Sequence, residues 1–292
     1  MTLHAPDFLA IGHVAKDRDP HTSEFRIGGT AAYSALTAAR LGLRTALTTS
    51  LSCRELLSPL GPDIQLFVAP SPNTTTFIND YSLGPRRQQV SSIAGAIQAQ
   101  HVPRRWREAS IVHIGPIARE IEPGIIDLFP DALVCVSPQG WMRRWDDAGE
   151  VTMGPWEDAE LVLSRADILV LSEEDTAHEP GLEQSYRSKV PVVVLTQGSR
   201  GAQVYARGDR FHVPALPSQT VDPTGAGDVY AAAFAIRYHE TRDPLDAATF
   251  AACTASFVVE GWGLEAIPTR KQVTTRLDQW GLGSKGSPSK TR

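Results

Sequence analysis

Short apolar runs recur along the chain, and several are followed by stretches with helical spacing. The runs cover residues 8–14, 45–51, 111–115, 132–137, 167–172 and 190–196. The last four are bounded by polar residues, which is typical of strands buried on both faces of a parallel sheet. Small and apolar residues at helical spacing predict helices over 29–42, with Gly42 as the C-cap, and over 156–166. This alternation predicts an open, doubly wound α/β sheet.

Two segments depart from this pattern. Residues 74–81 and 86–92 alternate polar and apolar positions and are joined by "SLGP", which is a turn signal. They predict a hairpin that stands outside the main sheet as a lid. From residue 224 onward the pattern is mostly helical. The last ten residues, 283–292, are basic and rich in Gly and Ser, so we expect a flexible tail.

Composition narrows the classes of partner. The chain has 292 residues, a net charge of -5 and an estimated pI of 5.9, so nothing favours nucleic acid or an acidic membrane surface. No apolar stretch reaches the ~18 residues of a membrane span, and the N-terminus lacks signal-peptide character. Cys53, Cys135 and Cys253 are far apart and have no metal-site spacing. We therefore expect a cytoplasmic protein.

The segment "VDPTGAGDVY", residues 221–230, carries the clearest candidate chemistry. Gly225, Ala226 and Gly227 precede a helical run, and backbone N–H groups at a helix N-terminus bind anions. A dinucleotide fingerprint would need a third Gly where Tyr230 stands, and a P-loop would need a Gly-Lys pair that the chain lacks. The segment therefore predicts a phosphate-binding turn without its own lysine.

Asp228 directly follows this turn. The N–H groups around it favour its ionised form, so the expected carboxylate is a poor phosphate ligand. It is well suited to accept a hydroxyl proton while that oxygen attacks a γ-phosphate. The alternative for such an Asp is a simple helix cap.

Three segments in order resemble the signatures of the ribokinase-like (PfkB) carbohydrate kinases. They are "FRIGGTAAYSALTAARLG", "VVVLTQGSRGAQVY" and "DPTGAGD", where Pro223 stands at a position that is often Thr, and the similarity covers most of residues 8–278. The resemblance implies a three-layer sandwich, with a mostly parallel sheet flanked by helices. It also implies a small β lid near 15–28 and 74–92, within one kinase domain over 1–282.

The resemblance also implies roles for individual residues. Asp228 resembles the catalytic base, and Gly225, Ala226 and Gly227 resemble the anion hole. On the sugar side the matching residues are Asp17, Gly28 and Gly29. On the nucleotide side they are Thr196, Gly198, Gly201, Asp222, Thr224, Cys253 and Ser256. ATP and Mg²⁺ are the implied cofactors, and many relatives form homodimers through the lid.

One place departs from the family pattern. The family often has Asn-x-x-Glu after the strand that matches residues 167–171, where it helps to organise magnesium and phosphates. Here Ser172 and Asp175 occupy those two positions, so Asp175 is the candidate metal ligand. The two residues between them, Glu173 and Glu174, also suit the first turn of a helix.

The acceptor is predicted from polar residues around the expected lid. Asn79, Arg86 and Gln139 suit a neutral polyol, and several stretches resemble the branch that includes myo-inositol kinases. An uncharged sugar or cyclitol is therefore the leading prediction. Three alternatives stay open. They are a nucleoside kinase that uses Phe77, Tyr81 or Tyr33, a phosphosugar kinase that uses Arg143 and Arg144, and a non-catalytic sugar-binding regulatory protein.

Overall fold

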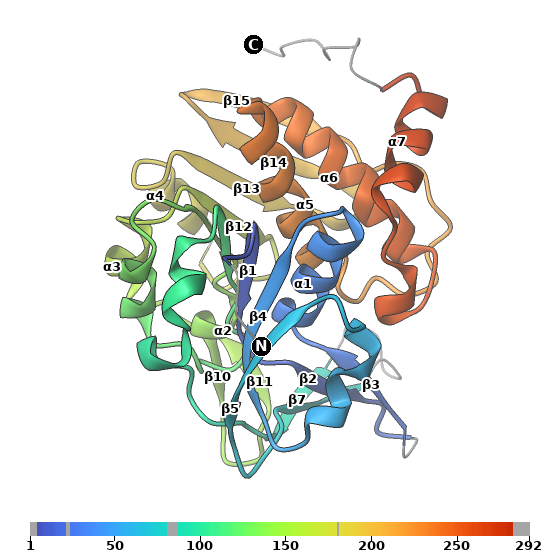
Figure 1. Ribbon diagram of the computed structural model, residues 1–292. Helices are drawn as coiled ribbons and strands as arrows, with labels where there is room; N and C mark the ends of the chain where they lie inside the picture. The colour runs from blue at the N-terminus through green and yellow to red at the C-terminus, as the bar shows by residue number, and fades with distance from the viewer. Residues whose placement is uncertain (1–4, 22–23, 81–86, 180, 283–292) are drawn as a thin grey trace.

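The computed structural model describes residues 5–21, 24–80, 87–179 and 181–282. The predicted tail and Arg86 lie outside the described residues. Among those described, the largest element is a nine-stranded sheet (Figure 1). In sheet order its strands are β15 (Asp209–Val213), β14 (Ala202–Ala206), β13 (Val192–Thr196), β12 (Ile168–Ser172), β9 (Leu133–Val136), β8 (Ile111–Ile114), β1 (Phe8–Ile11), β4 (Thr45–Leu51) and β5 (Gln65–Pro70).

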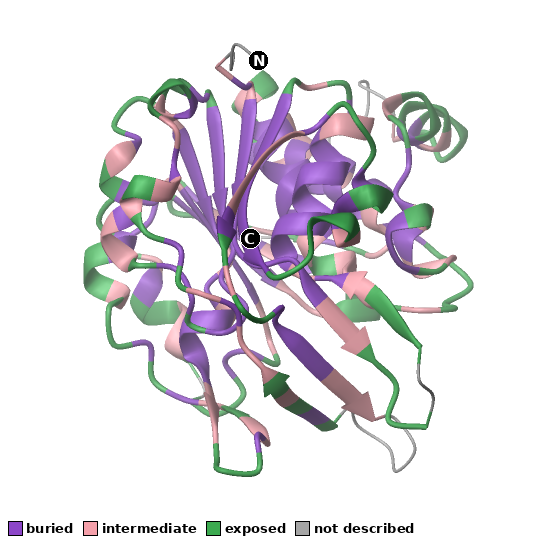
Figure 2. Ribbon diagram, turned by 60° about the horizontal axis from the view of Figure 1, so that its bottom comes forward, coloured by how far each residue is buried: buried purple, intermediate pink, exposed green. Residues whose placement is uncertain are grey.

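The sheet is parallel from β5 to β13, and β14 and β15 continue it as an antiparallel edge. The strand residues alternate between two hydrophobic clusters. Phe8 and Ala10 of β1 join one cluster, while Leu9 and Ile11 join the other. The sheet is therefore buried on both faces, as its continuous apolar runs predict (Figure 2).

Helices form the two outer layers. The α-helices are α1 (Thr30–Arg40), α2 (Gln139–Met142), α3 (Ala159–Leu163), α4 (Leu182–Tyr186), α5 (Ala226–Thr241), α6 (Pro244–Val259) and α7 (Arg270–Gln279). The 3₁₀ helices are η1 (Arg54–Leu60), η2 (Ala99–His101), η3 (Arg104–Glu108), η4 (Pro123–Leu128), η5 (Gly198–Arg200) and η6 (Gly263–Ala266). Residues of α1, α5 and α6 pack in the first cluster, while η3, η4 and α3 contribute to the second. This is the predicted three-layer α/β sandwich.

One of two predicted helices ends where the sequence indicates, and the other is shorter than predicted. Helix α1 ends as expected, because Gly42 has a φ of +92° and Leu43 N–H donates to Ala38 O, which closes a Schellman turn. The helix predicted over 156–166 is only Ala159–Leu163. Trp156 precedes it and stacks on Trp141, with 5.4 Å between the ring centroids. This packing holds the start of the segment outside the helix.

A second, four-stranded sheet covers one end of the large sheet (Figure 2). Its order is β3 (Phe25–Gly28), β2 (Ala15–Arg18), β6 (Thr76–Asp80) and β7 (Arg87–Ser92). The segment predicted to form a hairpin supplies β6 and β7, which pair antiparallel. A short antiparallel pair, β10 (Arg143–Trp145) and β11 (Val151–Met153), meets this lid where Gln89 bridges to Glu150. The expected pairing of two chains through the lid stays a prediction.

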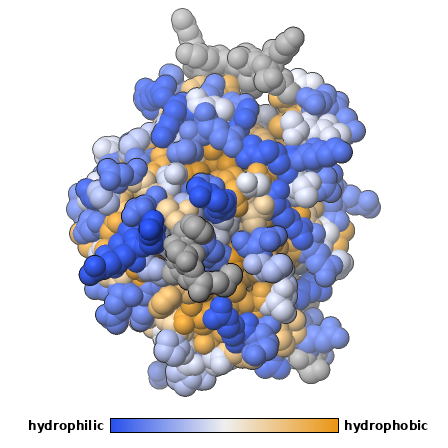
Figure 3. Space-filling model, viewed as in Figure 1, coloured by the Kyte–Doolittle hydropathy of each residue, from blue (hydrophilic) through white to orange (hydrophobic). Residues whose placement is uncertain are grey.

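The described surface is largely polar. Figure 3 shows hydrophilic side chains over most of one face, with smaller hydrophobic areas between them. Within the described ranges no helix has the length and apolar character needed to cross a bilayer.

Candidate active site

The candidate site lies beyond the carboxyl ends of the parallel strands, which is the usual ligand edge of such a sheet. Asp17 follows β1, Gln139 follows β9, and Asp175 follows β12. The charges of Asp17, Asp175 and Arg143 all act on the carboxyl group of Asp228. The fold thus brings together four sequence-predicted residues, Asp17, Gln139, Asp175 and Asp228, from distant parts of the chain.

Two helix N-termini meet at Asp228. Asp228 lies in the first turn of α5, and Thr30 is the first residue of α1. The Thr30 hydroxyl donates to Asp228 Oδ1 at 2.7 Å, which fixes one carboxylate oxygen. Sequence reasoning missed Thr30, whose only signal is its position directly after the predicted pair Gly28 and Gly29.

The electrostatics of Asp228 differ from the expectation that N–H groups favour its ionised form. Burial raises the pKa of Asp228 from 3.8 to about 6. The Thr30 hydrogen bond and the charge of Arg143 lower it, while the charges of Asp17 and Asp175 raise it. Desolvation is the largest of these effects, so withdrawal from water outweighs the favourable donors. The sequence could not reveal this, because burial depends on the tertiary packing.

The turn before α5 is shaped by Gly225. Its φ is +79°, which is a left-handed conformation that suits glycine. A β-carbon at Gly225 would lie 2.2 Å from Cε1 of Tyr33, so the ring of α1 closes the space beside the turn. Gly227 already belongs to the helix, and a β-carbon there would meet no described atom within 4 Å. Gly225 therefore forms the turn, while Gly227 leaves the start of the helix without a side chain.

The loop that leads into the turn is held by Asp222. The Asp222 carboxylate accepts a hydrogen bond from Thr224 N–H at 2.9 Å and pairs with Arg26 Nη1 at 3.3 Å. The Arg26 guanidinium also lies 4.2 Å from the ring centre of Trp262. Because Arg26 belongs to lid strand β3, this contact joins the lid to the predicted anion hole.

The lid presents a chain of polar groups. Asn79 Nδ2 donates to Asp17 Oδ1 at 3.3 Å, and Gln88 Nε2 donates to Asn79 Oδ1 at 2.7 Å. Asp17 lies against Gly28, where a β-carbon would be 1.9 Å from Asp17 Oδ2. Gly29 caps α1 at a φ of +92°, and a β-carbon there would lie 2.4 Å from His13 O. The glycine pair therefore gives Asp17 and α1 room to approach each other.

Asp175 has a structural partner on each oxygen. Asp175 Oδ2 accepts from Ser172 N–H at 2.8 Å, Asp175 N–H donates to Ser172 Oγ, and Gln139 Nε2 donates to Asp175 Oδ1 at 3.1 Å. The first two bonds are the reciprocal pattern of a capping box. No group of three or more His, Cys, Asp or Glu residues in the described ranges could hold a metal ion. The role of Asp175 as a metal ligand stays a prediction, because a hydrogen-bonded carboxylate can still coordinate a cation.

The predicted nucleotide side is only partly assembled. Thr196 ends β13 beside Ser172 of β12, and Gly198 opens η5. By contrast, a β-carbon at Gly201 would lie 2.1 Å from Val213 O, so this glycine serves the packing of β15. Cys253 is fully buried with Sγ toward Val273 O, and Ser256 Oγ accepts from Arg276. Cys253 and Ser256 are thus buried side chains of α6, and their place beside a nucleotide stays a prediction.

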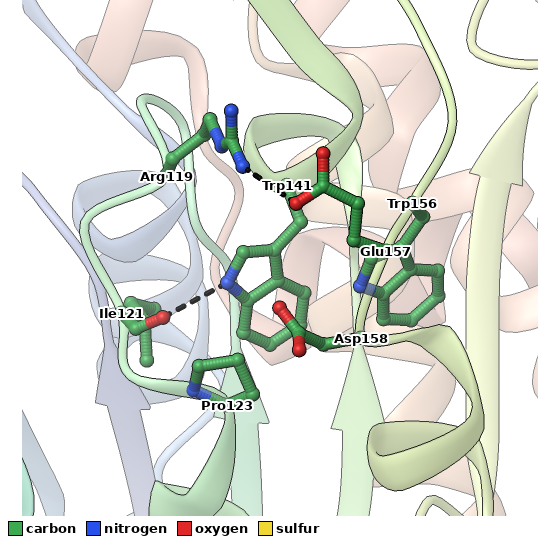
Figure 4. A pocket seen from close by; sticks show the side chains of 7 residues that line it. All are labelled: Arg119, Ile121, Pro123, Trp141, Trp156, Glu157 and Asp158. Atoms are coloured by element: carbon green, nitrogen blue, oxygen red, sulfur yellow. Dashed lines mark hydrogen bonds and ion pairs between the residues drawn. The ribbon is translucent and has the colours of Figure 1, made fainter.

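Two cavities lie outside this cluster. One, of about 80 Å³, is lined by Arg119, Ile121, Pro123, Trp141, Trp156, Glu157 and Asp158 (Figure 4). It is much smaller than the roughly 300–1,000 Å³ of typical ligand sites. The other, about 470 Å³, lies at the far end of α5 beside His239 and Arg242. Thr241, the last residue of α5, follows Asp228 by 13 positions, so that end lies roughly 20 Å from Asp228.

Solved structures confirm the fold. A pyrophosphate-dependent kinase of the ribokinase family, complexed with a pyrophosphate analog and myo-inositol, has a TM-score of 0.79 at 22% identity, over 92% of this chain and 99% of that chain. The Arabidopsis thaliana ribokinase complexed with ribose and ATP has a TM-score of 0.71 at 22% identity, over 94% of this chain and 99% of that chain. The fold is ribokinase-like.

Relatives in sequence define the class of enzyme. A nucleoside kinase from Methanothermobacter thermautotrophicus is 29% identical over 316 aligned positions, covering 94% of this chain and 97% of that protein. A cytidine kinase from Thermococcus kodakarensis is 27% identical, covering 88% and 97%. With the fold and the site, they make this chain a carbohydrate-type kinase. Residues 156–270 match the model of the pfkB family carbohydrate kinases.

We predict that Gly225→Ala destabilises the fold. The substitution places a β-carbon against Tyr33 at a left-handed φ. Left-handed backbone costs about 1–2 kcal/mol, and overpacking adds about 1–3 kcal/mol. Urea denaturation measures the change, and Gly227→Ala is the matched control, since its β-carbon meets open space and alanine favours a helix. Equal stability of the two variants would contradict this account of the turn.

We predict that Asp228→Asn stabilises the protein more at neutral than at acidic pH. The pKa of Asp228 is raised to about 6, so between about pH 4 and 6 the folded state keeps a proton that the unfolded state releases. The contribution of the Asp228 carboxyl to the free energy of unfolding is therefore lost as pH rises through that window. The neutral amide of Asp228→Asn does not titrate, so the variant does not lose this contribution. Thermal melting at pH 5 and 7.5 measures the difference in stability between Asp228→Asn and wild type. The same difference between variant and wild type at both pH values would refute it.

Proposed function

We propose that the protein transfers a phosphoryl group from ATP to a hydroxyl group of an uncharged sugar or cyclitol, with Asp228 as the general base. The observation that carries this proposal is the position of Asp228. Its carboxylate lies in the first turn of α5, directly after the Gly225 turn and within electrostatic range of Asp17 at the lid. A base, an anion-binding helix end and a polyol-binding wall therefore adjoin one another.

The geometry supports a direct transfer. Asp228 takes the proton of the acceptor hydroxyl as that oxygen attacks the donor phosphorus. A carboxyl group with a pKa of about 6 is ionised at neutral pH and is a stronger base than an ordinary Asp. Thr30 holds Oδ1 and so orients the carboxylate. The N–H groups that open α5 stabilise the negative charge of the transferring group.

The phosphoryl donor is proposed as ATP, although one structural neighbour is pyrophosphate-dependent and another was solved with ATP. Mg²⁺, bound with the donor, supplies positive charge to its phosphate oxygens. With Mg²⁺ bound, donor phosphates and water would supply most of its ligands, and Asp175 would be the protein ligand, since Gln139 and Ser172 already orient its carboxylate.

The aromatic residues favour a sugar or cyclitol over a nucleoside. Phe77 is 3% exposed and Tyr33 is 2% exposed, so neither ring is free to stack on a base. Tyr81 lies outside the described residues. The arginine pair does not form a phosphate clamp, since Arg143 bonds to Ile117 O and Arg144 turns to Glu157. Carboxylate and amide groups at Asp17 and Asn79 suit neutral hydroxyls.

A nucleoside acceptor is the second candidate. The observation in its favour is Trp262, which is 55% exposed beside the Asp222 loop and contacts Arg26 of the lid. Two full-length relatives are a nucleoside kinase and a cytidine kinase. If a nucleoside is the acceptor, Trp262→Ala raises its KM, whereas the KM of a sugar acceptor changes little.

The role of Asp228 is tested by Asp228→Asn. The amide keeps the size of the side chain but cannot accept the proton, so turnover falls at least about 10²-fold, within the ~10²–10⁴ range of general bases. Acceptor binding, measured by calorimetry, survives. Near wild-type turnover would exclude Asp228 as the base.

The substrate assignment is tested with a panel of acceptors and two donors. Coupled assays with Mg²⁺ combine ATP or pyrophosphate with myo-inositol, ribose, fructose, fructose 6-phosphate, adenosine and cytidine. We expect ATP-dependent turnover of a neutral sugar or cyclitol, with myo-inositol as the first candidate. Turnover of the phosphosugar or a nucleoside alone would overturn the acceptor class. Turnover with pyrophosphate alone would overturn the donor, and binding without any turnover would favour a non-catalytic protein.

A further inference from the structure

Arg143 is a charged side chain in an unusual place. It is 5% exposed, although Arg is rarely buried unless it is paired. Its Nη1 donates to Ile117 O at 2.8 Å and its Nη2 donates to Gln139 Oε1 at 2.7 Å. Its guanidinium carbon lies 4.9 Å from the ring centre of Phe77. Arg143 thus joins the loop after β8, helix α2 and lid strand β6.

The contacts of Arg143 extend to the residues around the base. Gln139, which accepts from Arg143, donates to Asp175 at 3.1 Å. Asp175 in turn caps the turn after β12. The guanidinium therefore holds the wall of the site in a fixed geometry through hydrogen bonds that a lysine could not make simultaneously, because only Arg offers a planar fork of donors.

The charge of Arg143 faces a cluster of carboxylates. Its positive charge acts on Asp228 in the direction opposite to Asp17 and Asp175. Thr30 from α1 donates to Asp228, and the neighbouring Tyr33 stays neutral because burial raises its pKa. His113, in the neighbouring strand β8, is also neutral, since burial lowers its pKa to about 4. Arg143 is thus the cation, within the described part of the chain, that offsets the two neighbouring acids at the base.

We propose that Arg143 is a positioning residue for Asp228: its buried guanidinium fixes the wall formed by Ile117, Gln139 and Phe77 and holds a positive charge near the base. This proposal rests on the proposed function, in which Asp228 is the base. It assigns Arg143 no contact with the phosphoryl group.

Arg144 provides a matched control in the next position. Its Nη1 donates to Trp141 O and Arg143 O, and its Nη2 pairs with Glu157 at 3.0 Å. Trp141 and Glu157 line the small cavity of Figure 4. A general loss of packing or of positive charge from this segment would affect both arginines, whereas an effect on Asp228 belongs to Arg143 alone.

The experiment compares Arg143→Met, Arg143→Lys and Arg144→Met with wild type, using the acid limb of kcat/KM against pH. Loss of the opposing charge raises the pKa of Asp228, so in Arg143→Met the acid limb moves to higher pH. Arg143→Lys restores the limb toward its wild-type position but keeps a raised KM for the acceptor, because the forked hydrogen bonds are missing. Arg144→Met leaves the limb in place.

The change in the pKa of Asp228 can also be measured without any acceptor substrate. Titration of the Asp228 carboxyl by ¹³C NMR reports the pKa in each folded variant, so failure of the kinase assignment and failure of this proposal are separate results. If Arg143→Met does not fold, Arg143→Lys and Arg143→Gln are compared instead. We expect the pKa of Asp228 to rise in Arg143→Gln, which lacks the charge, and to stay near its wild-type value in Arg143→Lys, which keeps it. An unshifted Asp228 in a folded variant that lacks the charge would overturn the proposal.

Discussion

A carboxylate withdrawn from water at the start of a helix is the constraint around which this structure is arranged. Asp228 is held there by the Thr30 hydroxyl, and burial raises its pKa to about 6. Such burial is costly for a charged group unless other groups compensate. The Gly225 turn, the ring of Tyr33 beside it and the N-terminus of α1 together supply the position, and the sheet edge supplies the neighbouring acids.

Two arginines connect the lid to this centre from different sides. Arg26 of β3 pairs with Asp222 in the loop before the Gly225 turn, and Phe77 of β6 lies against Arg143. The lid position is therefore linked both to the predicted donor loop and to the wall near the base.

Much of the fold could be predicted because its signals are local. Strand β4 covers the predicted residues 45–51 without change, and Gly42 ends α1 as its position implies. Asp228 was also accessible, since a Gly-x-Gly turn before a helix identifies an anion site. The short length of α3 could not be predicted from the sequence, because the stacking of Trp156 on Trp141 is a tertiary contact.

The rest of the site depends on contacts between distant segments. Thr30 is 198 positions from Asp228, and no pattern near either residue indicates their hydrogen bond. Ser172 and Asp175 match a metal-organising motif in position, yet they form a capping box. Cys253 follows a family position, yet helical packing buries it. In each case the local motif identifies a candidate residue, while its burial and hydrogen-bond partners depend on tertiary contacts.

The central claim is that Asp228 is a half-buried carboxylate with the properties of a base. The most direct measurement is a ¹³C NMR titration of the Asp228 carboxyl in the wild-type protein, assigned by the signal that disappears in Asp228→Asn. The structure predicts a pKa of about 6. A pKa at the ordinary 3.8 would contradict the account, because the carboxylate would then be solvated as on an open surface.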